Sequence, residues 1–163
     1  MQLFFQYNWR VREEWFEWCK NLTDEELQQK RSGGVGSIIE TLLHIIDVEY
    51  SWINVLKGEK IIDFTIREYH SLEKIIRLSG ELQSEMITYL QNWNIAWENE
   101  NATPPWMDGT YKKGEIIRHV IAHEIHHAGQ LSVWARDMGR EPVGASFIGR
   151  GFIPEKKAGY PAF

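Results

Sequence analysis

Apolar residues recur every three or four positions in four stretches of the chain, which is the spacing of amphipathic α-helices. These stretches predict helices over residues 3–19, 38–57, 71–97 and 114–138. A short additional helix is expected after Thr23, because the sequence there has the pattern of a helix cap followed by an acidic first turn. No segment between the helices has convincing strand character. The pattern therefore predicts an all-α protein, built as a four-helix bundle.

The connections between the predicted helices are long, so the pattern does not fix the up-and-down order of the bundle. Beyond the last helix, residues 140–163 combine glycine and proline with four aromatic residues. We expect this segment to form an ordered tail that wraps over the bundle. A chain of 163 residues has an ordinary size for one domain, and we expect residues 1–163 to form a single bundle domain.

The predicted helix over 38–57 is apolar around most of its circumference, which is typical of a helix buried on several sides. One narrow polar stripe interrupts it. The members of the stripe recur at spacings of four and three residues: Glu40, His44, Asp47, Ser51 and Asn54. The stripe is either the solvated edge of the helix or the wall of a functional site, and the pattern alone does not separate the two.

Composition and charge exclude several classes of function. The chain has 18 basic and 23 acidic residues, a net charge of −5, and its lysines and arginines are scattered, so nothing indicates nucleic-acid binding. No apolar run approaches the roughly 18 residues of a membrane span, and the N-terminus lacks the features of a signal peptide. Cys19 is the single cysteine, which excludes an internal disulfide and predicts an inert buried thiol. We expect a cytoplasmic protein.

Four of the six histidines fall within nine residues of the last predicted helix. His123 and His127 are one helical turn apart, so their imidazoles lie on one face and can reach the same metal ion. Both occupy the core seam, where a bundle normally has leucine or isoleucine. Two buried imidazoles without partners are costly, and a metal ion would satisfy both. Metal binding is therefore favoured over hydrogen-bonded core histidines or a partly exposed histidine-rich face.

The same helix contains the pattern His-Glu-x-x-His, in which zinc peptidases use the glutamate to polarise water. On a straight helix, however, Glu124 points about 100° away from His123, whereas His127 lies only about 40° away. The glutamate can therefore be an ordinary surface residue. A peptidase also needs a third ligand downstream, and no histidine follows His127. A metal-dependent hydrolase of the zinc-peptidase type is accordingly the least favoured alternative.

Two histidines seldom complete a metal site, so a third ligand is expected from elsewhere. The candidates are His44, His70, His119 and His126. His119 and His126 lie on the same helix as the first two ligands, and three ligands from one helix rarely converge on a tetrahedral ion. His70 is at the expected solvent end of another helix. His44, on the buried helix and within its polar stripe, is the favoured third ligand.

These motifs resemble those of the DinB-like (DinB/YfiT-like) family of metal-binding four-helix bundles. His44, with Asp47 three residues later and Trp52 near the end of the same helix, is similar to the first hallmark of the family. The second hallmark, His-x-x-x-His followed by Gly-Gln, is matched by residues 123–130. Each motif is short, so their order and context carry the resemblance, which spans roughly residues 1–152.

The resemblance implies a divalent metal ion, zinc or nickel, held by His44, His123 and His127 at the bottom of an open cavity. Three neutral ligands leave at least one position for water or substrate, as in catalytic sites. The family includes thiol-dependent S-transferases and isomerases that use bacillithiol, mycothiol or glutathione, and hydrolase-like members. For this chain the resemblance implies a metal-dependent transferase that joins a bacillithiol-type thiol to a small electrophilic substrate. A non-catalytic protein that binds metal or a small molecule is the alternative, and the dimers common among relatives are compatible with a homodimer.

The many aromatic residues of the chain are candidates for the walls of that cavity. With 8 Trp, 7 Phe and 6 Tyr, the chain either packs its core with rings or lines a cavity with them. Four residues are candidates for the wall, although ordinary core packing is favoured for each: Trp52, Trp106, Trp134 and Tyr50. Asp47 is either a hydrogen-bond acceptor that orients a ligand histidine or a solvated helix residue.

Overall fold

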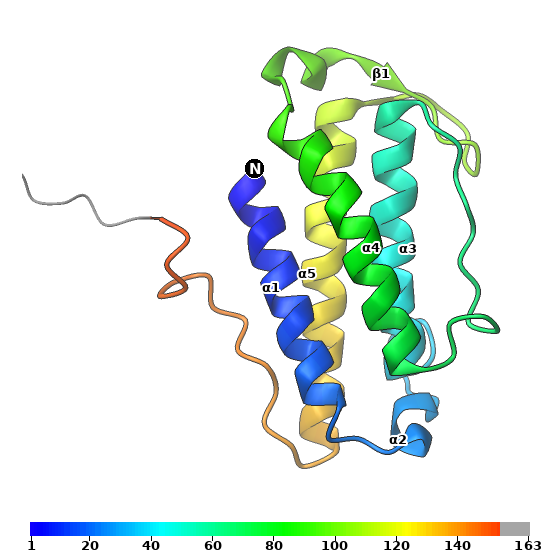
Figure 1. Cartoon of the computed structure of the whole chain (residues 1–163), viewed down its shortest axis with the longest axis vertical. Helices are drawn as coiled ribbons and strands as arrows, with labels where there is room; N and C mark the ends of the chain where they lie inside the picture. Colours follow the sequence, from blue (N-terminus) through cyan, green and yellow to red (C-terminus); the bar gives the residue numbers. More distant parts are fainter. Residues whose placement is uncertain (154–163) are drawn as a thin grey trace, which may run out of the picture.

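The structure, a computed structural model, describes residues 1–153 as four long helices packed side by side, with smaller elements at both ends (Figure 1). The described elements are, in chain order, α1 (Gln2–Cys19), α2 (Asp24–Gln28), α3 (Ile38–Lys57), α4 (Leu72–Gln91), the 3-10 helix η1 (Ile95–Asn99), β1 (Asn101–Ala102), β2 (Tyr111–Lys112) and α5 (Lys113–Asp137). The prediction of an all-α four-helix bundle is therefore confirmed. None of the described helices is both long and apolar enough to cross a membrane.

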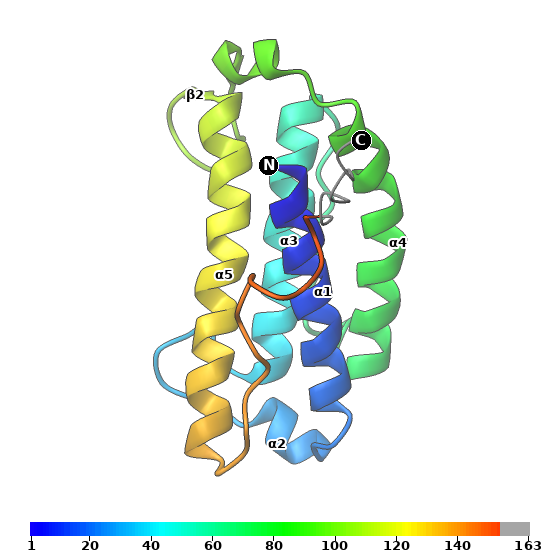
Figure 2. The same cartoon turned by 90° about the vertical axis from the view of Figure 1, so that its left-hand side faces the viewer.

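The four long helices run in two directions. α1 and α5 run one way, and α3 and α4 run the other way (Figures 1 and 2). Around the bundle, each helix packs mainly against two neighbours, in the order α1, α5, α3, α4. α3 and α4 can be parallel because the segment 58–71, which joins them in the chain, runs back along the outside of the bundle beside α3 (Figure 1). As a result α3 and α5, which carry the predicted metal ligands, are antiparallel neighbours.

The helix ends follow the capping signals of the sequence. Thr23 begins α2 with a complete capping box, in which it exchanges side-chain and backbone hydrogen bonds with Glu26. The side chain of Ser37 accepts a backbone hydrogen bond at the start of α3, and Gly58 ends that helix in the left-handed conformation, with φ of 72°. These two signals fix the length of α3 and thereby the height of His44 within the bundle.

The predicted helix over 71–97 is wrong at its C-terminal end. α4 ends earlier, and the chain turns at Asn94, whose side chain accepts a backbone hydrogen bond that starts η1. The helical spacing of apolar residues continues past this end because Tyr89, Trp93 and Trp97 contact one another across the turn, with ring centroids 5.8 to 6.2 Å apart. The rings pack as one cluster without a continuous helix beneath them.

A two-residue antiparallel strand pair follows, and the sequence did not predict it. β1 and β2 pair Asn101 with Lys112 and Ala102 with Tyr111. Strands this short leave no alternating pattern to detect. The loop between them places Trp106 against α3, so the hairpin helps to build one end of the site described below.

Residues 140–153 run from the end of α5 along α1 (Figure 2). Phe147 packs against Phe4 and Tyr7, with ring centroids 5.2 and 5.5 Å apart. Arg150 forms an ion pair with Glu14 at 2.7 Å. The prediction of an ordered tail is confirmed over these residues. Its remaining part, 154–163, lies outside the described residues.

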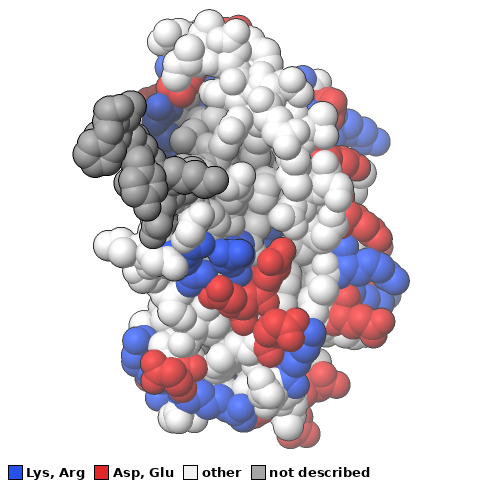
Figure 3. Space-filling view, turned by 60° about the vertical axis from the view of Figure 1, so that its left-hand side comes forward, with Lys and Arg blue, Asp and Glu red and all other residues white. Residues whose placement is uncertain are grey.

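The side of the molecule formed by α1 and this tail carries charges of both signs. In Figure 3, the basic and acidic side chains are intermixed in the lower part of this face, and a broad area above them carries few charged groups. The ion pair between Arg150 and Glu14 is one example of this mixing. On this face, the charges therefore do not gather into the basic surface typical of nucleic-acid binding.

Candidate metal centre

The structure brings His44 of α3 together with His123 and His127 of α5. The Nε2 atom of His123 lies 3.1 Å from Nε2 of His44 and 3.1 Å from Nε2 of His127. With one nitrogen taken from each ring, all three atoms lie within 4.8 Å of one another. The three residues predicted as ligands therefore form one group, here called the histidine triad, between two antiparallel helices.

The spacing of these nitrogens fits a divalent metal ion. A tetrahedral zinc ion with Zn–N bonds of 2.0–2.1 Å has its nitrogen ligands about 3.3 Å apart. Two of the nitrogen pairs in the triad, at 3.1 Å, come within a few tenths of an ångström of that value. Three imidazoles contribute no charge, so they suit zinc or nickel, which accept nitrogen ligands, better than magnesium or calcium.

The surroundings of the triad keep its imidazoles neutral. Burial, together with the nearby rings of His127 and His44, lowers the pKa of His123 to about 3. Burial is also the main reason why the pKa values of His44 and His127 are lowered. Because a neutral imidazole offers a lone pair to a metal ion and an imidazolium does not, the triad is in its metal-binding form at neutral pH.

Gln130 orients one member of the triad. Nδ1–H of His127 donates a hydrogen bond to Oε1 of Gln130 at 2.7 Å, and the Gln130 amide donates to Nε2 of His126 at 3.0 Å. With its proton on Nδ1, His127 presents a free lone pair on Nε2 to the rest of the triad. Gln130 is the last residue of the second family hallmark, but the motif alone does not indicate a role for it. The available signal was its position three residues after His127 on the same helix.

The remaining three histidines lie outside the triad. His70 is exposed, with its Nδ1 atom 3.3 Å from the backbone oxygen of Arg67. His126 is exposed and contacts Gln130. His119 is exposed as well, and it packs edge-on against a tryptophan of α3. His44 is thus the histidine that the fold joins to the pair on α5.

Glu124 lies in the core, and its interpretation as an ordinary surface residue is wrong. Its side chain is 6% exposed, and both of its carboxylate oxygens accept hydrogen bonds from Arg12 of α1 at 2.7 Å. Glu124 points about 100° away from His123, as helix geometry predicts. That direction leads to the neighbouring helix α1, whereas we expected it to lead to solvent. The carboxylate is therefore engaged away from the triad. This geometry opposes the zinc-peptidase alternative, in which Glu124 would polarise a water at the metal.

The polar stripe of α3 is not a solvated edge. Two of its five residues are buried and the other three are half-buried. Glu40, His44 and Asp47 line a cavity of about 210 Å³ together with Phe64. Asp47 accepts a hydrogen bond from the backbone N–H of Phe64, and burial raises its pKa. No hydrogen bond joins Asp47 to a histidine among residues 1–153, so the predicted orienting role is not seen, although the stripe contributes His44 to the triad.

An aromatic wall lies on the other side of His123. Trp52 packs edge-on against Trp106 and against His119, with ring centroids 4.9 and 5.5 Å apart, and the His119 ring lies 5.8 Å from that of His123. Trp52 and His119 also line a mainly apolar cavity of about 300 Å³, together with Met107. Two of the four predicted wall residues, Trp52 and Trp106, therefore form a ring cluster that reaches the triad only through His119.

The other two predicted wall residues have different surroundings. Trp134 is buried, and its Nε1–H donates a hydrogen bond to the backbone oxygen of Ser32 at 2.9 Å. Gly34 lies directly over the Trp134 ring. Tyr50 packs behind Phe64, with ring centroids 5.2 Å apart. Trp134 therefore belongs to the core, and Tyr50 supports the wall of the cavity next to His44 from behind.

The sequence model of the DinB family matches residues 1–153 of this chain. The chain belongs to the DinB family. Among its relatives, the uncharacterized protein YizA of Bacillus subtilis (strain 168) is 50% identical over 155 residues, which cover 94% of this chain and 98% of that protein. A DinB-like protein from Bacillus cereus ATCC 10987 has a similar crystal structure, with a TM-score of 0.66 at 19% identity over 86% of this chain and 94% of that one. The resemblance inferred from the motifs is thereby confirmed.

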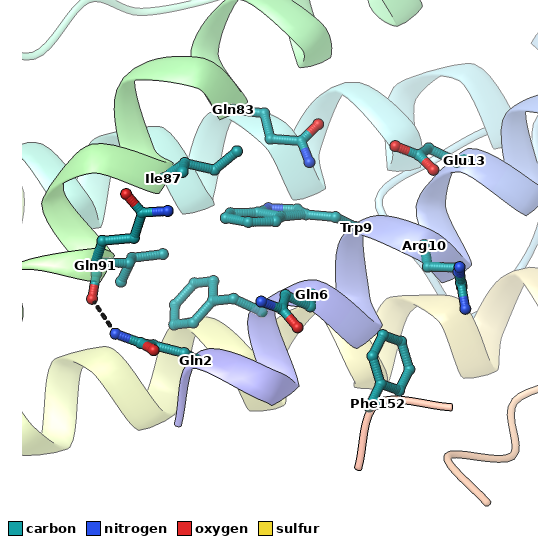
Figure 4. Close-up of a pocket in the computed structure, with 11 residues that line it drawn as sticks. Gln2, Gln6, Trp9, Arg10, Glu13, Gln83, Ile87, Gln91 and Phe152 are labelled. Atoms are coloured by element: carbon teal, nitrogen blue, oxygen red, sulfur yellow. Dashed lines mark hydrogen bonds between the residues drawn. The ribbon is translucent and has the colours of Figure 1, made fainter. Parts of the chain in front are cut away.

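This DinB-family protein has a further cavity away from the triad, between α1 and α4. It holds about 390 Å³, and four glutamines surround the indole of Trp9 there: Gln2, Gln6, Gln83 and Gln91 (Figure 4). Gln2 donates a hydrogen bond to the backbone oxygen of Leu90 at 2.8 Å. Among the residues that the structure describes, no histidine lines this cavity. The histidine triad is therefore separate from this groove.

Proposed function

We propose that this protein is a metal-dependent S-transferase that joins a low-molecular-weight thiol of the bacillithiol type to a small electrophilic substrate. The observation that carries the proposal is the convergence of three neutral imidazoles, one of which, that of His44, lines a cavity together with two carboxylates. A zinc or nickel ion held by His44, His123 and His127 would lower the pKa of a thiol that coordinates it. Three protein ligands leave a position for that thiol.

The cavity next to His44 suits the thiol substrate. Its wall contains Asp47 and Glu40, and one oxygen of each carboxylate, Oδ1 and Oε2 respectively, has no hydrogen-bond partner among the described residues. We assign the removal of the thiol proton to the carboxylate of Asp47, which lines this cavity. Burial raises the pKa of this carboxyl group, which brings it closer to that of an effective proton acceptor at neutral pH. The backbone N–H of Phe64 holds the carboxylate in place.

The mainly apolar cavity next to His119, one helical turn before His123, suits the electrophile. Trp52 and Met107 offer apolar surface to a ring or alkyl group. In the transfer, the sulfur forms a bond to the electrophilic carbon, and the leaving group departs with the electron pair of the bond that breaks. The thiol proton passes to Asp47 and then to solvent, so atoms and charge balance.

The test is the reaction of monochlorobimane with bacillithiol, in which the thiol sulfur displaces chloride. The metal-free protein is compared with protein supplied with zinc or with nickel, each with and without the thiol. We expect product to form faster than in the uncatalysed reaction of the thiol only when both metal and protein are present. His44→Ala and His123→Ala should abolish the acceleration, whereas the matched control His70→Ala should retain it, because His70 lies outside the triad.

The same assay distinguishes a thiol transferase from a non-catalytic metal-binding protein. Stoichiometric binding of zinc or nickel without turnover across bacillithiol, mycothiol, glutathione and cysteine would contradict a transferase of these thiols. The protein would then be a non-catalytic metal-binding member of its family. Retention of turnover by Asp47→Asn would show that the carboxylate of Asp47 does not accept the thiol proton.

A further inference from the structure

A cluster of buried charges lies at the centre of the bundle, and all four long helices contribute to it. Arg12 of α1 donates from Nε and Nη2 to the two oxygens of Glu124 on α5, each at 2.7 Å. The same Nη2 donates to Oε2 of Glu49 on α3 at 2.6 Å. Nη1 of Arg12 lies 3.4 Å from Oγ of Ser79 on α4, and Nε1–H of Trp9 donates to Oε1 of Glu49 at 2.7 Å.

The cluster is almost completely withdrawn from water. The side chains of Arg12 and Glu49 are each 2% exposed, and that of Glu124 is 6% exposed. Burial alone would lower the pKa of Arg12, but Glu124 and Glu49 together raise it above its ordinary value, so the guanidinium stays charged. Buried ion groups of this kind often add little stability compared with apolar residues of similar volume. The contribution of the cluster to stability is thus a weak reason for its presence.

The position of the cluster links it to the histidine triad. Glu124 directly follows His123 on α5, and Glu49 comes five residues after His44 on α3. The imidazoles meet on one side of this helix pair, and the carboxylates meet at Arg12 on the side that faces the core. A single planar guanidinium that binds both carboxylates restricts the rotation and the axial position of α5 relative to α3. The same two degrees of freedom set the distances within the triad.

We propose that Arg12 is a positioning residue of the metal centre. By binding Glu49 and Glu124 at once, it holds α3 and α5 in the relative position at which His44 meets His123 and His127. This inference rests on the metal binding of the proposed function and does not depend on the transfer of a thiol.

The test compares the wild-type protein with two variants. The triple variant Arg12→Met/Glu49→Leu/Glu124→Leu makes the whole cluster apolar and leaves no buried charge unpaired, so its unfolding midpoint in urea should stay close to that of the wild type. Arg12→Lys keeps the charge but loses the planar fork that binds both carboxylates. Cobalt(II) is the probe, because its affinity and its visible d–d absorption report the binding and the geometry of the site.

We expect the triple variant to bind cobalt(II) at least about 10-fold more weakly, with a changed d–d spectrum, while it remains folded. Arg12→Lys should lie between it and the wild type. Arg150→Met is the matched control, because it removes an arginine that pairs with Glu14 of α1 and touches neither α3 nor α5. Its cobalt(II) spectrum should equal that of the wild type.

Two outcomes would overturn the inference in distinguishable ways. If the triple variant had the cobalt(II) affinity and spectrum of the wild type, Arg12 would not position the metal centre. The proposed function would be unaffected by this result. If the wild-type protein itself bound no cobalt(II), zinc or nickel, the proposed function and the inference would both fail. Should the triple variant not fold, wild-type affinity and spectrum in Arg12→Lys would overturn the inference instead.

Discussion

His127 donates a hydrogen bond from Nδ1 to Oε1 of Gln130 at 2.7 Å, and this bond decides which of its nitrogens faces the triad. The amide oxygen of glutamine only accepts hydrogen bonds, so the proton is on Nδ1 and the lone pair is on Nε2. The Nε2 atom lies 3.1 Å from Nε2 of His123. A residue that touches no metal thus selects the tautomer that a metal ion requires.

Replacement of Gln130 should therefore weaken metal binding. We expect Gln130→Met to lower the zinc affinity by about 10-fold to 100-fold, because it removes the acceptor for Nδ1–H of His127. Gln130→Glu restores an acceptor and should retain the wild-type affinity or exceed it. Competition with a chromophoric chelator measures both. Equal affinity in the methionine and glutamate variants would contradict the assigned role of this hydrogen bond.

The triad itself is tested by removing its members one at a time. His44→Ala, His123→Ala and His127→Ala should each lose most of the bound metal, because two imidazoles seldom hold an ion alone. His70→Ala and His126→Ala should keep it, since both residues are exposed and outside the triad. Equilibrium dialysis followed by elemental analysis gives the stoichiometry. Full metal content in His44→Ala would rule out a site shared between α3 and α5.

Gly34 should tolerate no side chain. A Cβ atom there would lie 2.6 Å from Cη2 of Trp134, a rigid buried ring, so we expect Gly34→Ala to lower the free energy of unfolding by about 1–3 kcal/mol. Gly80 is the matched control, because it lies within α4 and a Cβ would meet nothing within 4 Å. Gly80→Ala should raise stability by about 0.5–1 kcal/mol. Urea titrations of both variants would show opposite signs, and a stable Gly34→Ala protein would contradict the close packing.

Cys19 should be unreactive in the folded protein. It is completely buried, and burial raises the pKa of its thiol to about 12. At about pH 8 the native protein should therefore not react with a thiol reagent such as DTNB, whereas the protein unfolded in urea should release one equivalent of chromophore. Rapid reaction of the native protein would show that the core around α1 opens readily.

The metal-free protein should lose stability as the pH falls. The pKa of His123 is lowered to about 3 in the folded state, and those of His44 and His127 are lowered as well, whereas in the unfolded chain histidine titrates near 6.5. Below about pH 6.5 the unfolded state therefore binds more protons, and the free energy of unfolding decreases as the pH falls from there toward 3. Urea unfolding at several pH values measures the slope. His123→Asn should make it shallower between about pH 6.5 and 5.5, and an unchanged slope would contradict the lowered pKa.

The sequence was sufficient for the features that depend on neighbouring residues along the chain. The helices over 38–57 and 114–138 were predicted almost to their ends, because apolar spacing and caps such as Ser37 act within a few residues. The pairing of His123 with His127 follows from one helical turn in the same way. The preference for His44 depended on its place in a polar stripe and on the resemblance to the DinB family, and the structure brings its ring to that pair.

Tertiary structure decided the features that depend on which helix lies opposite. Helix geometry predicts that Glu124 points about 100° away from His123, but it does not say whether solvent or the core lies in that direction. In the structure Arg12 of α1 lies there and binds the carboxylate, so Glu124 is buried in the core. The end of α4 and the approach of Trp106 to Trp52 were likewise not predictable, because the rings pack across a turn and a hairpin. Local spacing fixes the direction of a side chain on its own helix, whereas its surroundings are fixed by residues distant in the chain. For this reason the sequence determined the helices and the candidate ligands, and only the packing of four helices decided how they meet.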